Sequence, residues 1–239
     1  MISVIIPCYN HAATLIKCLN SLVAQQIELE IIIVNDGSTD STEEKVNNYI
    51  KAAGETVPII YLKINHGWAP RARNMGAKTA RGDYLLFSDA DLVFKSNALI
   101  LMHRTLQNNL NASYAYSNFT SSLITFKGMP FNATALKDNN YIHTTSLMRR
   151  QDFPGFDESL NKFQDWDLWL TMLDKGRIGV FIPKILFHAC VSRRGISRWR
   201  PRTWYYFWSK IYDKFGFAPK LYLHYIKSKN IVKRKHNIH

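Results

Sequence analysis

The sequence has 239 residues, of which 46% are hydrophobic and 21% are charged. These proportions are typical of a globular protein and exclude an intrinsically disordered chain. No apolar run reaches the length of a membrane-spanning helix, about 20 residues, and no secretory signal precedes the first apolar run. The three cysteines form no CxxC pair, which indicates reduced thiols, so we expect a cytoplasmic protein.

The net charge of +13 is concentrated at the C-terminal end of the sequence. Residues 190–239 hold 13 of the 31 Lys and Arg residues but only one of the 18 acidic residues, Asp213. Residues 1–189 hold the remaining 18 basic and 17 acidic side chains, so this part is almost neutral. We therefore expect a near-neutral body followed by a strongly basic segment.

Predicted strands and helices alternate from the start of the chain. The continuous apolar run ISVIIP (2–7) predicts a strand buried on both faces. Apolar residues then recur at helical spacing over 15–23, and EIIIV (30–34) predicts a second strand. Ser41 and Glu44 have the spacing of a capping box, which predicts the start of the next helix.

The same alternation continues through two more strands. IIYLKI (59–64) predicts the third strand, and Pro70 fits the first turn of the helix that follows it. DYLLFSD (83–89) predicts the fourth. This order predicts an α/β protein with a Rossmann-like, doubly wound and mostly parallel sheet, whose ligands bind beyond the carboxyl ends of the strands.

Polar and aromatic residues stand where these ligands are expected. Those that follow the predicted strands are Cys8, Tyr9, Asn10, Asp36, Asp40, Arg71, Arg73, Asp89 and Asp91. They should converge on one edge of the sheet. Acids, arginines and an aromatic ring together suit a nucleotide that carries a diphosphate.

The run LLFSDADLVF places two carboxylates after a buried strand. In extended chain Asp89 and Asp91 point to the same side. Two carboxylates on one face suit a hard cation, Mg²⁺ or Mn²⁺, whose coordination shell a substrate phosphate completes. The alternative is that one acid caps a helix and the other lies in a solvated turn.

Five motifs together resemble family 2 glycosyltransferases, which are inverting enzymes with the GT-A fold. In chain order they read VIIPCYN, VNDGSTD, GWAPRARNMG, SDADL and GFDESLNKFQDWDLWL. The resemblance implies a GT-A domain over residues 1–190, with a nucleotide-sugar-binding half (1–95) and an acceptor half (96–190). Residues 191–239 would form a basic, aromatic and helical extension. The resemblance also implies metal-dependent transfer of a sugar from a nucleotide-sugar, with a UDP-sugar favoured, to a glycan or lipid-linked glycan.

The resemblance assigns roles to single residues. It implies that Pro7, Tyr9, Asp36, Arg73 and Asp89 bind the nucleotide-sugar, that Asp91 holds Mn²⁺ or Mg²⁺, and that Asp165 is the general base. A helix N-terminal acid that interacts with the helix dipole is the alternative for Asp165. Trp166 and Trp169 either stack on sugar or pack in the core, and their spacing favours the core for at least one of them.

The sequence departs from the family pattern at three places. Cys8 stands where a small or hydroxyl residue is common, which predicts a pocket open to alkylation. Gln164 replaces the first acid of the usual Glu-Asp pair. Where a metal-assisting histidine is common the loop carries Arg193 and Arg194, and His188 is either a substitute ligand or a structural residue.

Two other classes of protein remain alternatives. FSDADLVF also resembles the nucleophile motif of haloacid-dehalogenase-type phosphatases, with Asp89 as nucleophile, although three strand-helix units precede it here. The sequence pI of about 9.7 is compatible with a nucleic-acid-binding module. The body is neutral, however, and its loops are acidic, so we expect no nucleic acid as partner.

The C-terminal segment is both cationic and aromatic. Eleven aromatic residues lie between Trp199 and Tyr225, and one helical face gathers Trp204, Phe207, Trp208, Ile211 and Phe215. Such a segment could dock residues 199–239 on an anionic membrane, placing the protein peripherally on the inner face. Its alternatives are packing against the body or a second subunit, and binding to an acidic polymer. The sequence does not indicate an oligomeric state.

Overall fold

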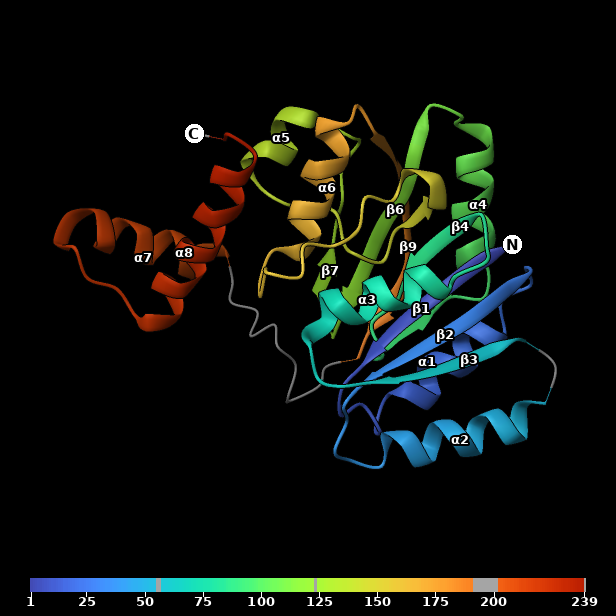
Figure 1. Cartoon of the computed structure of the whole chain (residues 1–239). Coiled ribbons are helices and arrows are strands. Elements are labelled where there is room, and N and C mark those ends of the chain that lie inside the picture. The colour runs from blue at the N-terminus through green and yellow to red at the C-terminus, as the bar shows by residue number, and fades with distance from the viewer. Residues whose placement is uncertain (55–56, 123, 191–201, 239) are drawn as a thin grey trace.

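Within the described residues, a nine-stranded mixed sheet forms the centre of the protein, with helices on both of its faces (Figure 1). The computed structural model describes residues 1–54, 57–122, 124–190 and 202–238. The strands are β1 (Ile2–Cys8), β2 (Leu29–Asp36), β3 (Ile59–Ile64), β4 (Tyr84–Phe87), β5 (Leu92–Phe94), β6 (Ala112–Ser121), β7 (Ile124–Phe126), β8 (Leu147–Arg149) and β9 (Ile178–Ala189). The α-helices are α1 (Leu15–Val23), α2 (Thr42–Ala53), α3 (Trp68–Thr79), α4 (Ala98–Asn108), α5 (Ala133–Asp138), α6 (Gln164–Asp174), α7 (Arg202–Phe215) and α8 (Lys220–Lys235).

The first four strands form a parallel half-sheet in the order β3-β2-β1-β4. Cys8 pairs with Asn35, and Asp36 pairs with Ile64, so the carboxyl ends of β1, β2 and β3 are level. β4 ends where its Phe87 pairs with Ile5 of β1. The prediction of a doubly wound sheet is confirmed for this half, and its strand ends define one edge.

The second half of the sheet is mixed and continues in the order β8-β6-β9-β5, with β7 paired to β6. β8 is antiparallel to β4 and to β6, whereas β6 and β9 are parallel. β5 returns antiparallel beside β9, and the amide of Cys190 donates a hydrogen bond to the carbonyl of Asp91 at 2.8 Å. The end of β9 therefore lies directly beside the SDADL motif.

Alternating side chains of the buried strands supply two cores, one on each face of the sheet. Val4 and Ile6 of β1 face the core covered by α1 and α4, and Ile5 faces the core covered by α3, α5 and α6. Alternation of this kind is the period of a strand, and burial on both faces explains why the run at 2–7 is apolar except for Ser3, whose buried hydroxyl donates a hydrogen bond to Glu30.

The C-terminal helices lie away from the sheet, with α8 next to α6 and α7 on the outer side of α8 (Figure 1). They contact each other through Tyr205 and Tyr225, whose ring centroids are 4.2 Å apart. Val232 of α8 is fully buried in the core that α6 shares. The expected helical extension is present, and its second helix packs against the body.

The helix start predicted at Ser41 is confirmed, because α2 begins at the next residue. The Ser41 side chain makes no capping hydrogen bond, however, so the capping-box contact with Glu44 does not form. The Asp40 carboxylate instead accepts a hydrogen bond from the Thr42 amide at 3.0 Å. Among the helices described, none is long and apolar enough to cross a membrane.

Candidate functional site

The loops after β1 and β2 are hydrogen-bonded to each other at the carboxyl edge of the sheet. Asn10 has a left-handed backbone with φ of 57°. Its Oδ1 accepts hydrogen bonds from the amides of Thr39 (2.7 Å) and Asp40 (3.2 Å). Asn adopts this conformation more readily than most residues. The contact fixes the loop after β1 against the loop after β2.

Asp36, the last residue of β2, is held by the loop that follows β3. Its Oδ1 accepts a hydrogen bond from the Gly67 amide at 2.7 Å, and its Oδ2 lies 2.9 Å from Nδ1 of His66. The His66 ring contacts those of Tyr9 (4.4 Å between centroids) and Trp68 (5.1 Å). Tyr9 and Trp68 are 43% and 52% exposed. Exposed rings beside a carboxylate suit a flat heteroaromatic base.

Pro7 contributes to this edge from inside β1, where it pairs with Val34 and is buried. It stands two residues beyond the last β1–β4 pair, Ile5 with Phe87. Its missing amide hydrogen therefore falls where the hydrogen-bond ladder to β4 has ended, which is why a central strand tolerates proline here.

Arg73 of α3 joins the two halves of the protein. Its guanidinium donates one hydrogen bond to Oδ1 of Asp89 at 2.9 Å and another to Oε1 of Gln164 at 3.0 Å. The group lies 5.3 Å from the centre of the Phe156 ring. Its Nε is buried without a hydrogen-bond partner among the described residues. A buried donor left without a partner costs free energy, so an anionic ligand that reached this group would be stabilised.

Asp89 and Asp91 have different environments. Burial alone would raise the pKa of Asp89, but the neighbouring charges, chiefly Arg73, hold that pKa below its ordinary value. Burial and the negative charge of Asp89 raise the pKa of Asp91 to about 6. Within the described residues Asp91 makes no ion pair, so its carboxylate lacks a compensating charge. A divalent cation beside Asp91 would supply that charge, and the residues present therefore fit one.

Among the described residues, the structure does not show a complete set of protein ligands for such an ion. Across residues 1–54, 57–122, 124–190 and 202–238, no three His, Cys, Asp or Glu side chains are placed to hold a metal together. Mg²⁺ and Mn²⁺ commonly use one or two carboxylates and complete their shell with substrate phosphate and water. His188 lies on β9 opposite Val93, and its Nδ1 is 2.9 Å from the Thr120 hydroxyl. Arg193 and Arg194 lie outside the described residues.

Asp165 is the second residue of α6. Its Oδ1 accepts a hydrogen bond from the Trp166 amide at 2.9 Å, and its Oδ2 accepts one from Nδ2 of Asn140 at 2.8 Å. Burial raises the pKa of Asp165, against the opposing effects of the Trp166 amide and of His143. A carboxylate of raised pKa at a helix start is a better proton acceptor than a solvated one.

His143 is a site residue that sequence reasoning missed. Burial lowers its pKa, and the charges of both Asp89 and Asp165 oppose this shift, so the ring lies under the influence of both acids. Its Nδ1 accepts a hydrogen bond from the Thr145 amide at 3.0 Å, so the neutral ring carries its proton on Nε2. No local pattern marks His143 or Asn140. His66, by contrast, follows the third strand, and the strand-end rule could have found it.

The prediction about the exposure of Cys8 is wrong, whereas for Trp166 and Trp169 the core alternative is confirmed. Cys8 is 1% exposed and burial raises the pKa of its thiol to about 12, so it does not open the pocket to alkylation. Trp166 and Trp169 are both fully buried, and their indole N–H groups donate to the carbonyls of Leu136 (2.6 Å) and Ile142 (3.0 Å). Neither tryptophan can stack on a sugar.

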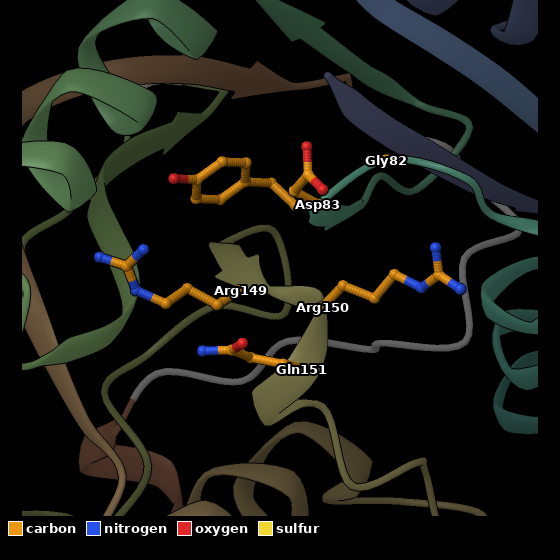
Figure 2. A pocket seen from close by; sticks show the side chains of 6 residues that line it. Gly82, Asp83, Arg149, Arg150 and Gln151 are labelled. Atoms are coloured by element: carbon orange, nitrogen blue, oxygen red, sulfur yellow. The ribbon is translucent and has the colours of Figure 1, made fainter.

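A shallow cavity of about 390 Å³ lies elsewhere, at the start of β4 (Figure 2). Its lining includes Asp83, Arg149 and Arg150. Arg149 is already engaged, because its guanidinium donates to the carbonyls of Ala112 (3.0 Å) and Leu106 (2.7 Å). The start of β4 is the end opposite to Asp89, so this cavity does not belong to the candidate site.

Comparison with known proteins identifies relatives along the whole chain. The family model described as glycosyl transferase family 2 matches residues 3–155. A putative teichuronic acid biosynthesis glycosyltransferase, TuaG of Bacillus subtilis, is 27% identical over 253 residues, covering 98% of this chain and 97% of that protein. A poly(ribitol-phosphate) beta-glucosyltransferase of Bacillus spizizenii is 39% identical over 111 residues, covering 45% of this chain but only 17% of that protein.

Solved structures share the fold at low sequence identity. S. aureus TarS 1-349 in complex with UDP-GlcNAc superposes with a TM-score of 0.68 at 20% identity, covering 93% of this chain and 68% of that chain. The mannosyltransferase PcManGT from Pyrobaculum calidifontis, in complex with GDP-Man and Mn²⁺, gives a TM-score of 0.68 at 17% identity, covering 97% and 69%.

The burial of the thiols leads to a testable prediction. Cys8 and Cys18 are buried with pKa values raised to about 12, chiefly by burial, whereas Cys190 is partly exposed. Thiolates are the reactive form, so iodoacetamide at pH 8 should modify Cys190 alone in the native protein. Mass spectrometry of tryptic peptides measures this, and all three thiols should react in urea. Modification of native Cys8 at the rate of Cys190 would contradict the buried site.

Proposed function

The chain belongs to glycosyl transferase family 2, and we propose that it moves a sugar from a nucleotide-sugar to a hydroxyl group of a glycan or lipid-linked glycan, with inversion. As a member of that family it is a nucleotide-sugar-dependent glycosyltransferase with the GT-A fold. The finer statements about donor, metal, acceptor and residue roles are our proposal.

The observation that carries the proposal is the bridge made by Arg73. One guanidinium contacts Asp89, which follows β4, and Gln164, which immediately precedes Asp165. Arg73 therefore links the edge of the sheet, where we expect the nucleotide diphosphate, to the start of α6, which carries the carboxylate of Asp165. Displacement at an anomeric carbon needs a stabilised leaving group on one face and a proton acceptor on the opposite face.

The donor-binding roles follow from the edge of the sheet. The nucleobase would pack against Tyr9, with Asp36 and the backbone near Pro7 facing its polar edge. Asp89 would accept a hydrogen bond from the ribose, and Arg73 would stabilise the charge that develops on the diphosphate. We favour a UDP-sugar. TarS in complex with UDP-GlcNAc supports this choice, whereas PcManGT in complex with GDP-Man keeps guanine donors open.

Asp91 would hold the metal, with His188 as a second ligand. The Thr120 hydroxyl occupies Nδ1 of His188, so Nε2 is the nitrogen available to an ion. When bound, Mn²⁺ or Mg²⁺ supplies Lewis-acid stabilisation of the departing diphosphate. The Mn²⁺ in PcManGT supports a divalent ion.

Asp165 would take the proton of the acceptor hydroxyl as its oxygen attacks the anomeric carbon. Asn140 and the Trp166 amide hold the carboxylate in one orientation, which limits reorganisation during the step. A single displacement inverts the anomeric configuration. The family supports this reaction over a phosphatase with Asp89 as nucleophile, and the bond from Arg73 to Asp89 would weaken that nucleophile.

Polysaccharide biosynthesis is the process that the relatives support, since TuaG is named for teichuronic acid biosynthesis. A lipid-linked acceptor would bring the enzyme to the inner face of a membrane. The outer side of α7 suits such a surface, because Tyr206 and Phe207 are 66% and 56% exposed. α8 adds Lys and Arg residues without any acid. We propose peripheral docking of α7 and α8 on anionic lipid.

The role of Asp165 is tested by Asp165→Asn. The amide keeps the shape of the side chain but cannot accept the proton, so kcat should fall by roughly 10²–10⁴ while donor affinity stays unchanged. Nucleotide release from UDP-GlcNAc, UDP-glucose and GDP-mannose measures the rate, and calorimetric titration with UDP measures binding. A variant that keeps the wild-type rate would reduce Asp165 to a residue that interacts with the helix dipole.

The metal site is tested by Asp91→Asn. Without metal, the variant should melt at a higher temperature than the wild type, because an uncompensated carboxylate beside Asp89 is removed. With Mn²⁺ and UDP the wild type should instead have the higher melting temperature, since only the wild type gains the stabilisation that ligand binding gives. Thermal melts with and without EDTA measure both. Equal Mn²⁺-dependent shifts in the two proteins would exclude Asp91 as a ligand.

Membrane docking is tested by sedimentation with liposomes. The double variant Tyr206→Ser/Phe207→Ser should pellet less with phosphatidylglycerol liposomes than the wild type, and neutral liposomes should pellet neither. Leu110→Ser is the matched control, because Leu110 is an apolar side chain 81% exposed on the body. High salt should release the wild type. A soluble acidic polymer that binds the wild type while liposomes do not would replace the membrane as partner.

A further inference from the structure

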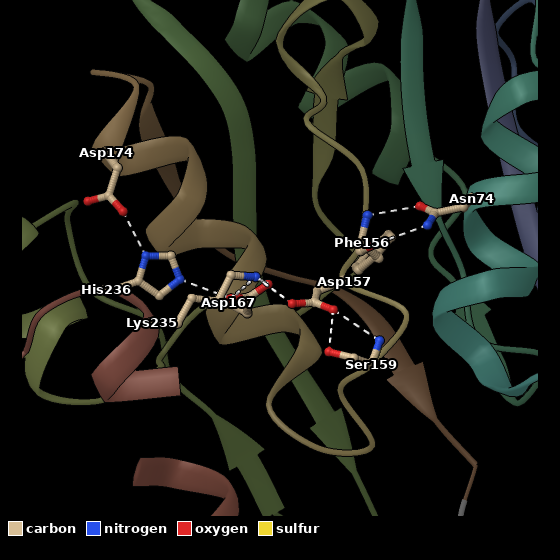
Figure 3. A network of polar contacts seen from close by, with 8 residues as sticks. All are labelled: Asn74, Phe156, Asp157, Ser159, Asp167, Asp174, Lys235 and His236. Atoms are coloured by element: carbon tan, nitrogen blue, oxygen red, sulfur yellow. Dashed lines mark hydrogen bonds and ion pairs between the residues drawn. The ribbon is translucent and has the colours of Figure 1, made fainter. Parts of the chain in front are cut away.

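A cluster of five charged residues fastens the end of α8 to α6 (Figure 3). Nζ of Lys235 lies 2.7 Å from Oδ2 of Asp157 and 2.9 Å from Oδ1 of Asp167. The ring of His236 lies between two carboxylates, with Nε2 2.9 Å from Asp167 and Nδ1 2.7 Å from Asp174. The end of α8 thus supplies an ammonium group and an imidazole ring to three acids. Burial alone would lower the pKa of His236, but its two carboxylates raise that pKa above the ordinary value, which favours the charged form.

The cluster holds both ends of the segment that carries Asp165. Asp157 lies eight residues before Asp165, and Asp167 lies two residues after it. Lys235 reaches both, so one ammonium group joins the start of the segment to the first turn of α6. Asp157 also accepts hydrogen bonds from the Ser159 amide (2.9 Å) and hydroxyl (2.6 Å), which tighten the same loop.

Asp167 depends on this cluster for its charge balance. Its side chain is 3% exposed, and the cations it contacts are Lys235 and His236. A buried carboxylate is tolerated only when it is paired and hydrogen-bonded, and loss of a partner leaves an uncompensated charge. Loss of the end of α8 would therefore leave an uncompensated carboxylate in the opening turn of α6.

Earlier turns of α8 contact the residues beside Asp165. The Tyr225 ring lies 5.2 Å from that of Phe163, and Nζ of Lys229 lies 5.6 Å from the Trp166 ring. Phe163 precedes α6 with a left-handed backbone, φ 59°, which is unusual for an aromatic residue and needs support from its surroundings. Three residues of α8 thus contact the start of α6: Tyr225 contacts Phe163, Lys229 contacts Trp166 and Lys235 contacts Asp167.

We propose that Lys235 and His236 are positioning residues for Asp165. They act through Asp157 and Asp167 and set the distance and angle between the base and the acceptor oxygen. The proposal rests on Asp165 as the general base. The C-terminal extension would then be part of the catalytic machinery, in addition to any surface it docks on.

The test compares Lys235→Met with the wild type, using Lys235→Arg as the conservative variant and Arg234→Met, an exposed neighbour, as the control. Nucleotide release is measured at saturating donor, with Mn²⁺ and water as acceptor, from whichever of UDP-GlcNAc, UDP-glucose and GDP-mannose the wild type uses fastest. Lys235→Met should lower kcat by about 10- to 100-fold, the effect of a small misplacement of a reacting group. KM for the donor should change less than about twofold.

Two further measurements separate positioning from general support of the fold. Amide hydrogen exchange in Lys235→Met should become faster over residues 157–167 and stay unchanged over residues 85–92. Lys235→Arg should recover most of kcat, because a guanidinium can bridge two carboxylates. If Lys235→Met does not fold, His236→Gln takes its place in the same measurements, because it removes the second cation while the α8 core contacts remain.

The outcomes are distinguishable. Wild-type kcat in Lys235→Met, alongside a strongly impaired Asp165→Asn, would overturn the positioning proposal and leave the proposed function standing. A parallel loss of kcat and donor binding would show that Lys235 only supports the fold, and would also overturn it. A wild-type rate in Asp165→Asn, or no nucleotide release by the wild type, would defeat the proposed function and the positioning proposal with it.

Discussion

The arrangement of the site depends on a single buried cation, the guanidinium of Arg73. It is 6% exposed and contacts one residue from each half of the protein, Asp89 and Gln164. A buried guanidinium requires partners at fixed directions because its donors are planar and rigid. The two contacts of Arg73 therefore fix the distance from α3 to the loop after β4, and the distance from α3 to the start of α6. Gln164 satisfies this requirement without adding negative charge, so Asp89 is the carboxylate that Arg73 contacts.

Charge is distributed along the chain so that acids and bases meet only after folding. The body carries almost equal numbers of both, and the excess of Lys and Arg lies in the last 50 residues. Lys235, which belongs to that excess, neutralises charge on Asp157 and Asp167. The basic segment is therefore not only a solvated tail. Its last turn balances charges that the body could not bury by itself.

The strands and the polar edge could be predicted from sequence because their signals are local. Continuous apolar runs marked β1 to β4, and residues directly after them, such as Tyr9 and Asp36, lie together as the strand-end rule requires. The spacing of Trp166 and Trp169 favoured the core for at least one of them, but spacing alone does not show that both rings are buried. The hydrogen-bond partners of Asp165 and Asp167 could not be predicted from the sequence either. Asn140 and Lys235 contact them across 25 and 68 residues, and no periodic pattern extends so far.

The distance along the chain between Lys235 and its carboxylates has a consequence for synthesis. Asp157 and Asp167 precede Lys235 by 78 and 68 residues. At ribosomal rates, the segment that holds Asp165 would wait roughly 3 to 16 s for its counter-charges to be made. The parallel half-sheet can form during that interval, since its strands are complete by Phe87. If Lys235 positions Asp165 as proposed, the edge of the parallel half-sheet would therefore form before the segment that carries Asp165 is fixed.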